Sequence, residues 1–363
     1  MSRILVDLLF YTGTKGGMES YVRQLYHEAG DRRLEFVGLA STELTRLGAP
    51  WFPGDLIPSG ISGENRASWA RGEVLSVSAA ARRIRADLIH APANIGPWSG
   101  ATPVVLTVHD LLAFRHPQFV PGRYGPVLRT LVRRAAAHAS RIITISEHSR
   151  ADIEEVLHPG AAVDVIPLAG GIPAAPATPG HREPALLLAL GNRLPHKNFE
   201  RLVEALGEIP EAVRPRLVVT GGGVDDPLRP LVERLGLAPW VELTGWLADR
   251  EIDALYARAT AVVIPTLFEG FGLPVLEAMG RGCPVICSNL AVLRELAQNS
   301  AVYFDPLRTE SLANTIVSAL ADPPLLAELA RSGLLRSREF TWHTTAMATI
   351  DSFYRVLDAD RSA

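Results

Sequence analysis

Two glutamates, Glu269 and Glu277, bracket the run EGFGLPVLE and are the side chains best suited to bind a polar ligand. The run lies between ATAVVIPT and CPVICSN, two apolar segments typical of buried parallel strands. Pro274 suits the first turn of a helix, so Glu277 is expected in that turn, beside free N–H groups and the positive end of the helix dipole. This arrangement predicts a diphosphate site in which Glu277 accepts a sugar hydroxyl. A capped turn with two solvated glutamates is the alternative interpretation.

A basic loop, GNRLPHKNFERL, follows the apolar strand ALLLAL and precedes a helix expected from about Asn198. It brings Arg193 and Lys197 close to a helix N-terminus, where cations oppose the dipole unless an anion binds. Arg binds an anion as a planar fork and Lys binds it as a point charge, so the pair predicts an anion pocket. A solvated basic turn is the alternative.

Two further candidates lie in the first half of the chain. The loop YTGTKGGMES follows the first strand and opens a helix, so Gly16 and Gly17 allow backbone N–H groups to reach a phosphate. A tight turn explains these glycines equally well. His109 ends the strand PVVLTVH, where its imidazole is placed to bond a substrate hydroxyl. A structural histidine is the alternative, and no neighbouring serine or cysteine suggests a hydrolase triad.

Trp246 and Leu247 come just after the strand VELTG, which places them near a nucleobase if a nucleotide binds there. A tryptophan packed in the core is the alternative. The two cysteines, Cys283 and Cys287, have no clustered His or Cys beside them and are interpreted as core thiols. No metal site is therefore expected.

The elements that position these residues alternate between apolar strands and helical patterns, which predicts parallel sheets in an α/β fold. The segment 171–184, rich in proline and glycine, separates a first domain at 1–170 from a second at 185–341. Two doubly wound Rossmann-like domains are expected to face each other across a cleft, because ligands bind at the carboxyl ends of parallel strands. The last helical stretch, within 342–363, is expected to pack back on the first domain.

Composition narrows the class of protein. The 363 residues are 47% hydrophobic and 21% charged, which is typical of globular domains. The net charge of -3 gives no basic footprint for nucleic acid. No apolar run reaches the roughly 18 residues that span a bilayer, and no signal-peptide pattern is present. A cytoplasmic protein is expected.

In order, these motifs resemble those of the retaining glycosyltransferases of family 4, which have the two-domain GT-B fold. The resemblance rests on the Gly-Gly pair and on the segments TVHDL, ITISEHSR, VIPLAG, GNRLPHKN and EGFGLPVLE, which cover nearly the whole chain. It implies that the first domain binds an acceptor and the second a nucleotide-sugar donor.

The resemblance also implies roles for individual residues. The donor diphosphate is assigned to Gly16, Gly17, Arg193, Lys197 and Leu273, and the ribose to Glu277. The transferred sugar is assigned to Glu269, Gly270, Phe271 and Gly272. His109 is expected next to the reacting centre, so His109 and Glu269 are the catalytic candidates.

The donor is narrowed by the TVHDL segment, followed by FRHPQFVP and a long arginine-rich helix. These features resemble the mannosyltransferase branch that builds bacterial surface polysaccharides, which implies GDP-mannose as donor and a saccharide or lipid-linked acceptor. UDP-glucose and dTDP-rhamnose stay open as donors.

The expected mechanism needs neither a metal nor a cofactor. No Asp-x-Asp pair stands at a strand end to hold a divalent cation, so Arg193, Lys197 and helix N-termini are expected to neutralise the leaving diphosphate. With Glu277 assigned to the ribose, no second carboxylate is evident near the sugar for a double displacement. A front-face displacement is favoured, in which the departing phosphate oxygen accepts the acceptor's proton.

Three other classes of protein share some of these features. A sugar-nucleotide epimerase or hydrolase shares the GT-B architecture but needs acid and base carboxylates that are not identified here. A nicotinamide oxidoreductase suits doubly wound sheets, yet neither half has a G-x-G-x-x-G fingerprint with an acidic residue following. A non-catalytic sugar-nucleotide-binding protein would have no need of the sugar-contacting positions.

Contact with the cytoplasmic face of an anionic membrane is suggested by the stretch Arg123 to Arg141. There Arg129, Arg133 and Arg134 alternate with Val127, Leu128, Leu131 and Val132 at helical spacing. A helix whose apolar stripe faces the domain core is the alternative.

Overall fold

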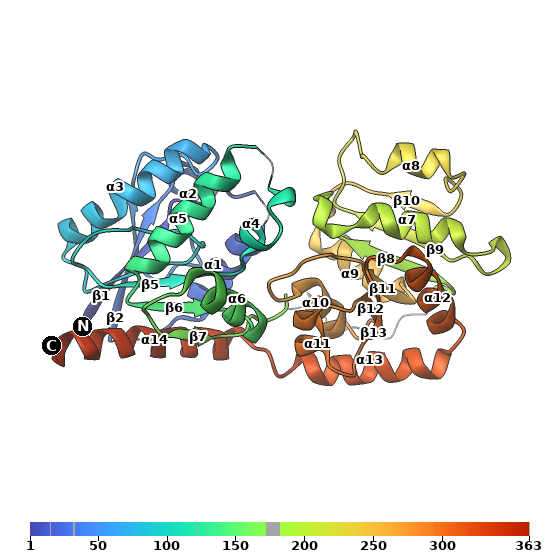
Figure 1. The fold of residues 1–363 in the computed structure, drawn as a ribbon. Coiled ribbons are helices and arrows are strands. Elements are labelled where there is room, and N and C mark those ends of the chain that lie inside the picture. The colour runs from blue at the N-terminus through green and yellow to red at the C-terminus, as the bar shows by residue number, and fades with distance from the viewer. Residues whose placement is uncertain (15, 32, 121, 172–181, 363) are drawn as a thin grey trace. The chain divides into compact units, whose positions relative to one another are not determined.

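The chain folds into two compact units, each built on one parallel sheet with helices on both faces (Figure 1). The computed structural model describes residues 1–14, 16–31, 33–120, 122–171 and 182–362. The first unit comprises Met1–Leu168 and Thr341–Ala363, and the second comprises Ala169–Phe340. Residues 172–181, which make up most of the expected linker 171–184, lie outside the described residues.

The sheet of the first unit has the strand order β3-β2-β1-β4-β5-β6-β7, with every neighbouring pair parallel. Its strands are β1 (Ser2–Leu8), β2 (Leu34–Ala40), β3 (Asp55–Pro58), β4 (Leu88–Ala91), β5 (Val104–Thr107), β6 (Arg141–Thr144) and β7 (Val163–Val165). The order reverses between β1 and β4, so the loops after these two strands flank the point where doubly wound sheets bind ligands.

The helices of the first unit are α1 (Gly17–Glu28), α2 (Thr42–Leu47), α3 (Arg66–Ile84), α4 (Leu112–Arg115), α5 (Tyr124–His138), α6 (Glu147–Leu157) and α14 (Trp342–Ser362), with a 3-10 turn η1 (Pro117–Phe119). Ser146 caps α6, because its Oγ accepts a hydrogen bond of 3.0 Å from the Ser149 N–H. The cap fixes the start of α6 directly after β6.

The final helix, α14, belongs to the first unit although the second unit precedes it in the chain. The Thr345 hydroxyl donates to the Pro167 carbonyl over 2.8 Å, and the Tyr354 hydroxyl donates to Asp31 over 2.8 Å. Phe353 is buried with its ring centre 5.1 Å from that of His90. The expected return of this helix to the first domain is confirmed.

The helix predicted to be amphipathic, α5, turns its apolar side to the protein's own core. Val132 is buried in the core of the first unit, and Leu128 and Leu131 pack against that core. Arg133 and Arg134 are exposed on the opposite side. Packing within the first unit therefore accounts for three of the four apolar positions, whereas Val127 is 50% exposed and is left, with the exposed arginines, to meet a membrane.

The sheet of the second unit has the order β10-β9-β8-β11-β12-β13, again with every neighbouring pair parallel. Its strands are β8 (Leu186–Leu190), β9 (Arg216–Thr220), β10 (Val241–Leu243), β11 (Ala261–Ile264), β12 (Val285–Ser288) and β13 (Val302–Phe304). The order reverses between β8 and β11, which makes the loops after these strands the expected ligand-binding edge.

The helices of the second unit are α7 (Phe199–Glu208), α8 (Arg229–Arg234), α9 (Asp249–Arg258), α10 (Leu273–Gly280), α11 (Ala291–Ala297), α12 (Thr309–Leu320) and α13 (Pro323–Ser337), with 3-10 turns η2 (Pro195–Lys197) and η3 (Glu211–Val213). Leu187, Leu217 and Val263 from the sheet pack with helix residues such as Leu202 and Ile316 in one core. This core fixes the strand ends from which the candidate loops emerge.

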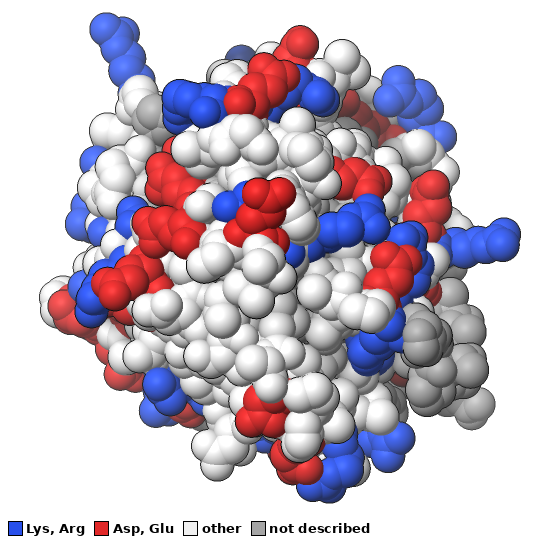
Figure 2. Space-filling view, turned by 90° about the vertical axis from the view of Figure 1, so that its right-hand side faces the viewer, with Lys and Arg blue, Asp and Glu red and all other residues white. Residues whose placement is uncertain are grey.

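Charges of both signs are interspersed on the surface that Figure 2 shows, with uncharged surface between them. This mixture agrees with the small net charge of -3. Within the part of the chain that the structure describes, no helix combines the length and the apolarity needed to span a membrane.

Candidate active site

The loops that follow β8 and β11 are tied together at the switch point of the second sheet. The Leu267 N–H donates to the His196 carbonyl over 2.7 Å, and the Thr266 hydroxyl donates to the same carbonyl over 3.1 Å. Asn198 is the N-cap residue of α7 without a side-chain capping bond, and its Nδ2 donates to the Pro265 carbonyl over 2.9 Å. Because these bonds join two loops from adjacent strands, the side chains that the loops carry have fixed positions.

Lys197 and Glu269 form an ion pair across these two loops. The Lys197 Nζ lies 2.7 Å from the Glu269 Oε1, and the two side chains are only 19% and 12% exposed. The sequence predicted both residues at one donor site, and the structure brings them into direct contact. In this arrangement the cation that would meet a phosphate is already neutralised by the carboxylate expected to meet the sugar.

Helix α10 begins beside this pair, and a glycine is required at its start. Gly272 is the N-cap residue with a φ of 103°, and a Cβ at this position would lie 2.6 Å from the Leu293 Cδ2. Leu273 is the first helical residue, with Pro274 second, and no side chain caps the helix. The N–H groups of this turn therefore have no side-chain acceptor at the cap position.

The segment before α10 is partly buried. Phe271 is 6% exposed, and its ring contacts that of Phe340 edge-on with centroids 5.9 Å apart. Glu269 and Gly270 are half-buried. The Phe271 side chain is thus part of the packing, so any contact it makes with a sugar would come from its backbone.

Glu277 is the fifth residue of α10 and lies just past the first turn in which the sequence predicted it. Among the described residues, its carboxyl group has no hydrogen bond and no ion pair within 4.0 Å. Burial raises the pKa of this carboxyl, Arg281 opposes the rise, and Asp249 and Asp253 add to it. A largely buried carboxyl whose two oxygens have no partner in the described part of the chain is suited to accept hydrogen bonds from a ligand's hydroxyl groups.

Arg193 has an internal partner that the sequence analysis did not assign. Its Nε and Nη2 donate to the Asp226 carboxylate, with the shortest distance 2.7 Å. Its remaining donors bond the carbonyls of Gly191, Thr220 and Val219. All five N–H donors of the guanidinium are therefore used within the protein. The assignment of Arg193 to a diphosphate stays a prediction, and here the side chain offers its charge but no unbonded N–H.

Trp246 is exposed and does not pack in the core, since 59% of its surface is accessible. It lies on the loop after β10, which is held to the loop after β9 by a hydrogen bond of 3.0 Å from the Gly221 N–H to the Gly245 carbonyl. Leu247 beside it is half-buried. An exposed tryptophan at the carboxyl edge of the sheet is available to stack on a planar ring.

In the first unit, the Gly-Gly pair lies at the N-terminus of α1. Gly16 is the N-cap residue with extended backbone, and Gly17 is the first helical residue. A Cβ at either position would meet no described atom within 4 Å. Neither packing nor a positive φ therefore demands glycine here, which is consistent with space kept open for a ligand.

His109 follows β5 and is held by the loop after β4. Its Nε2 donates to the Pro92 carbonyl over 2.8 Å, and its backbone N–H donates to the Asn94 Oδ1 over 2.7 Å. Tyr21 of α1 packs edge-on against the imidazole, with ring centres 4.9 Å apart. Burial lowers the pKa of His109 to about 4, so the ring is neutral near pH 7 and its Nδ1 is an acceptor.

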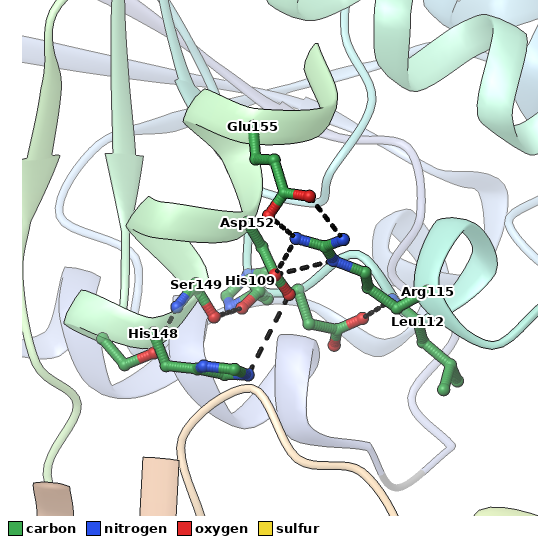
Figure 3. Close-up of polar contacts among 9 residues, drawn as sticks. His109, Leu112, Arg115, His148, Ser149, Asp152 and Glu155 are labelled. Carbon is green, nitrogen blue, oxygen red and sulfur yellow. Dashed lines mark hydrogen bonds and ion pairs between the residues drawn. The ribbon is translucent and has the colours of Figure 1, made fainter. Parts of the chain in front are cut away.

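A polar network fixes the helices on either side of His109 (Figure 3). Arg115 of α4 donates to Asp152 over 2.7 Å and to Glu155 over 3.1 Å, and both carboxylates belong to α6. The Ser149 hydroxyl of α6 donates to the His109 carbonyl over 3.2 Å. These contacts, which sequence spacing did not predict, hold the backbone at His109 in place.

Cys283 and Cys287 are both buried and reduced, which confirms their interpretation as core thiols. Among the described residues, no group of three His, Cys, Asp or Glu side chains is arranged to hold a metal ion.

The structure groups the predicted residues within each unit. In the first unit, α1 carries both the Gly-Gly pair and the Tyr21 that contacts His109. In the second unit, Lys197, Glu269 and the start of α10 are joined at one switch point. Sequence reasoning missed Asp226 as the partner of Arg193. No local pattern links residues 33 positions apart.

Comparison with known proteins decides the family. Residues 15–169 match the family described as Glycosyltransferase Family 4, and residues 175–335 match that described as Glycosyl transferases group 1. O-antigen chain mannosyltransferase B of Escherichia coli is 30% identical over 264 residues, which cover 69% of each chain. The chain belongs to the family 4 glycosyltransferases.

Solved structures agree with this membership. Sucrose-phosphate synthase from Thermosynechococcus elongatus superposes with a TM-score of 0.78 at 20% identity, covering 99% of this glycosyltransferase and 100% of that chain. Anabaena HepE in complex with UDP-glucose gives a TM-score of 0.72 at 20% identity, over 98% and 100% of the two chains. At this identity the likeness concerns the fold, and the GT-B fold implied by the sequence motifs is confirmed.

Proposed function

We propose that this glycosyltransferase moves mannose from GDP-mannose, with retention of configuration, onto a saccharide or lipid-linked acceptor of a surface polysaccharide or glycolipid. The observation that carries the proposal is the arrangement of Lys197, Glu269 and Glu277 at the β8/β11 switch point. It combines a cation, a helix start without a side-chain cap, and a carboxyl group that has no partner among the residues the structure describes. These are the groups that a diphosphate, a hexose and a ribose need.

The choice of mannose is supported by the similarity to O-antigen chain mannosyltransferase B. UDP-glucose is the first alternative, because HepE, which has the same fold, has been solved with that donor. dTDP-rhamnose is the second alternative. A sugar-nucleotide epimerase or hydrolase and a non-catalytic binding protein are alternatives of other classes.

The proposed reaction is a front-face displacement. The bond from the sugar's anomeric carbon to the departing phosphate oxygen breaks, and a bond to the acceptor oxygen forms on the same face. The departing phosphate oxygen accepts the acceptor's proton. Lys197 and the start of α10 stabilise the charge on the leaving diphosphate, which makes the reaction independent of metal. The family resemblance assigns His109 to the reacting centre, where its neutral ring would accept a hydrogen bond.

A transfer assay with purified enzyme tests the proposal. GDP-mannose, UDP-glucose and dTDP-rhamnose are each supplied with mannose-terminated oligosaccharide acceptors, and the product linkage is determined by NMR. We expect α-linked mannose from GDP-mannose alone, with turnover unchanged in EDTA. Loss of turnover in EDTA with rescue by magnesium or manganese would contradict metal independence. Release of free or epimerised sugar without acceptor would favour the epimerase or hydrolase.

We also propose peripheral contact with anionic membranes, supported only by exposed arginines such as Arg133 and Arg134. Each basic residue near an anionic surface contributes about 1 kcal/mol. We expect flotation with anionic but not neutral vesicles at low salt, and weaker flotation for Arg133→Glu with Arg134→Glu. Equal behaviour of the variant and the wild type would show that these arginines are merely solvated.

A further inference from the structure

Behind Glu277 lies a cluster formed by α9 and α10 that the proposed reaction does not use. Arg281 donates from Nε to the Asp253 Oδ1 over 2.7 Å, and its Nη1 donates to the Glu277 backbone carbonyl over 3.3 Å. The guanidinium carbon lies 4.8 Å from the centre of the Tyr256 ring. The side chains of Arg281 and Asp253 are 11% and 23% exposed. Arg281 is therefore held from three sides and is largely shielded from solvent.

The Glu277 carboxyl group is electrostatically dependent on this cluster. The charged groups that act on it are Asp249 and Asp253, which disfavour its ionised form, and Arg281, which favours it. Arg281 does not form an ion pair with this carboxylate, since its guanidinium is bonded to Asp253 and to the backbone. It thus supplies positive charge while leaving both Glu277 oxygens unoccupied.

A second observation concerns Tyr256, whose ring lies against the Arg281 guanidinium. Tyr256 is fully buried, and its hydroxyl has no hydrogen-bond partner among the described residues. Burial raises the pKa of this hydroxyl well above 10, and the Glu277 charge is the next largest cause. The hydroxyl is therefore protonated, and among the described residues this buried group stays without a partner despite the energetic cost.

We propose that Arg281 is a positioning residue of the donor site, whose guanidinium, fixed by Asp253 and by the Tyr256 ring, keeps the Glu277 carboxylate ionised and free to accept both hydroxyls of the donor's ribose. The inference rests on the proposed function, because it gives Glu277 a ribonucleotide to bind. It adds a residue that never touches the donor but sets the pH range over which the ribose is recognised.

The consequence for binding follows from the signs of the charges. An ionised carboxylate accepts two hydroxyl hydrogen bonds, whereas a protonated carboxyl has lost part of that capacity. Without Arg281, Glu277 would face Asp249 and Asp253 with no compensating cation, so its pKa would rise further. A rise of one unit makes the ionised form about tenfold scarcer at any pH below the pKa. As the pH is lowered, the variant should then lose donor affinity at a higher pH than the wild type does.

The test measures binding of GDP, UDP and 2′,3′-dideoxy-GDP by calorimetry between about pH 5 and pH 9. Wild type, Arg281→Gln and Arg281→Lys are compared. Arg258→Gln is the matched control. Arg258 is the last residue of α9, and its Nε also pairs with a carboxylate, that of Glu183 at 2.6 Å, but the Arg258 side chain is 51% exposed. Steady-state kinetics with saturating donor accompany the binding curves.

We expect Arg281→Gln to move the pH midpoint of ribonucleotide binding upward by about one unit, so that binding weakens by up to about tenfold at pH values below the wild-type midpoint and changes least where Glu277 stays ionised in both proteins. Binding of the dideoxy compound and kcat should change little. Arg281→Lys keeps the charge and should restore the wild-type midpoint, while Arg258→Gln should match the wild type throughout. A loss equal at every pH, or equal for the ribo and dideoxy compounds, would overturn the inference and reduce Arg281 to a structural role.

The two proposals fail in different ways. If the wild type binds GDP or UDP but Arg281→Gln binds with the same pH profile, only the role of Arg281 is wrong. If the wild type binds neither nucleotide at any pH while its fold is intact, the proposed function is wrong and the role of Arg281 falls with it.

Discussion

At the scale of single residues, the contact between Lys197 and Glu269 has a consequence for every substitution at the site. Each side chain is the other's partner when no donor is bound, and both are mostly buried. Removing one leaves the other as a partly buried, uncompensated charge. A loss of activity in a single variant therefore mixes a catalytic effect with a structural one.

A double-mutant cycle separates the two effects. We expect Glu269→Gln and Lys197→Met each to destabilise the second unit, and the double variant to be more stable than the sum predicts, with a coupling energy of about 1–3 kcal/mol. In kinetics, Glu269→Ala should lower kcat more than donor affinity, whereas Lys197→Ala should weaken both. Urea denaturation measures the coupling energy, and initial rates at varied donor concentration measure kcat and the apparent donor affinity.

The control for the cycle is the pair Arg331 and Glu328, which has the same 2.7 Å separation but side chains 66% and 55% exposed. Its coupling should be below about 1 kcal/mol. If the buried pair couples no more strongly than this exposed one, the contact is not a structural determinant. If either single variant keeps wild-type turnover with saturating donor, that residue has no role in transfer.

The candidate residues of the site could be named from sequence, and the pairing of their side chains could not. Glu269, Lys197 and Glu277 stood out because their types and neighbours suit a diphosphate and a sugar. The contacts of Arg193 were not predictable, since its guanidinium is held by Asp226 in a loop from another strand. Sequence spacing gives the edge of the sheet on which a side chain lies, but it does not give the side chain's partner.

At the scale of elements, β1 and α3 of the first unit are joined by a buried pair of carboxyl groups. Asp7 and Glu73 are each 1% exposed and interact electrostatically, and Glu73 accepts a bond of 2.5 Å from the Trp69 indole N–H. Burial raises the pKa of both groups. Two buried carboxyls in contact cannot both ionise readily, so the pair holds a proton in the folded state.

This proton makes the stability of the first unit dependent on pH. A carboxyl whose pKa is raised on folding stabilises most below its unfolded pKa, and that contribution is lost as the pH rises through the folded value. We expect Glu73→Gln to reduce this dependence, with the contribution of the buried Asp7 remaining, and to raise the free energy of unfolding at alkaline pH by about 1.4 kcal/mol for each unit of the abolished Glu73 pKa shift. Urea denaturation at acidic, neutral and alkaline pH measures it.

The matched control is Glu64→Gln, because Glu64 is exposed just before α3 and should leave the pH profile unchanged. If the free energy of unfolding of Glu73→Gln still falls with rising pH as in the wild type, the carboxyl pair is not the source of the pH dependence.

Most elements could be predicted from apolar runs and helical patterns. Among the elements that could not, two have a physical reason. Strand β3 is short, partly exposed and ends in Pro58, which suits the edge of a sheet but weakens the apolar signal. Helix α13 begins with two prolines that look like a break in sequence. In the structure Asp322 caps it, and proline is tolerated in the first turn.

At the scale of the whole molecule, the first unit is assembled from both ends of the chain. Helix α14 covers part of its sheet, with the Ser352 hydroxyl donating to Asp164 over 2.6 Å and Phe353 buried against His90. Loops and caps can be inferred locally, but contacts between residues this far apart depend on the completed fold. The first unit therefore cannot reach its final packing until the last helix docks.

This dependence predicts the effect of a single core substitution in α14. Phe353 is 1% exposed, so Phe353→Ala should destabilise the first unit by about 3–5 kcal/mol through lost burial and a residual cavity. Because the second unit has its own core, its stability should be unchanged. Hydrogen exchange should show faster exchange in β4, β5 and β6 while β8, β9 and β11 keep their protection.

Asp351→Ala, an exposed change on the same helix, should leave both sets of strands unchanged. Equal loss of protection in both sheets would mean that the two units unfold as one cooperative body, and no loss in either would mean that the first sheet is stable without the packing of α14.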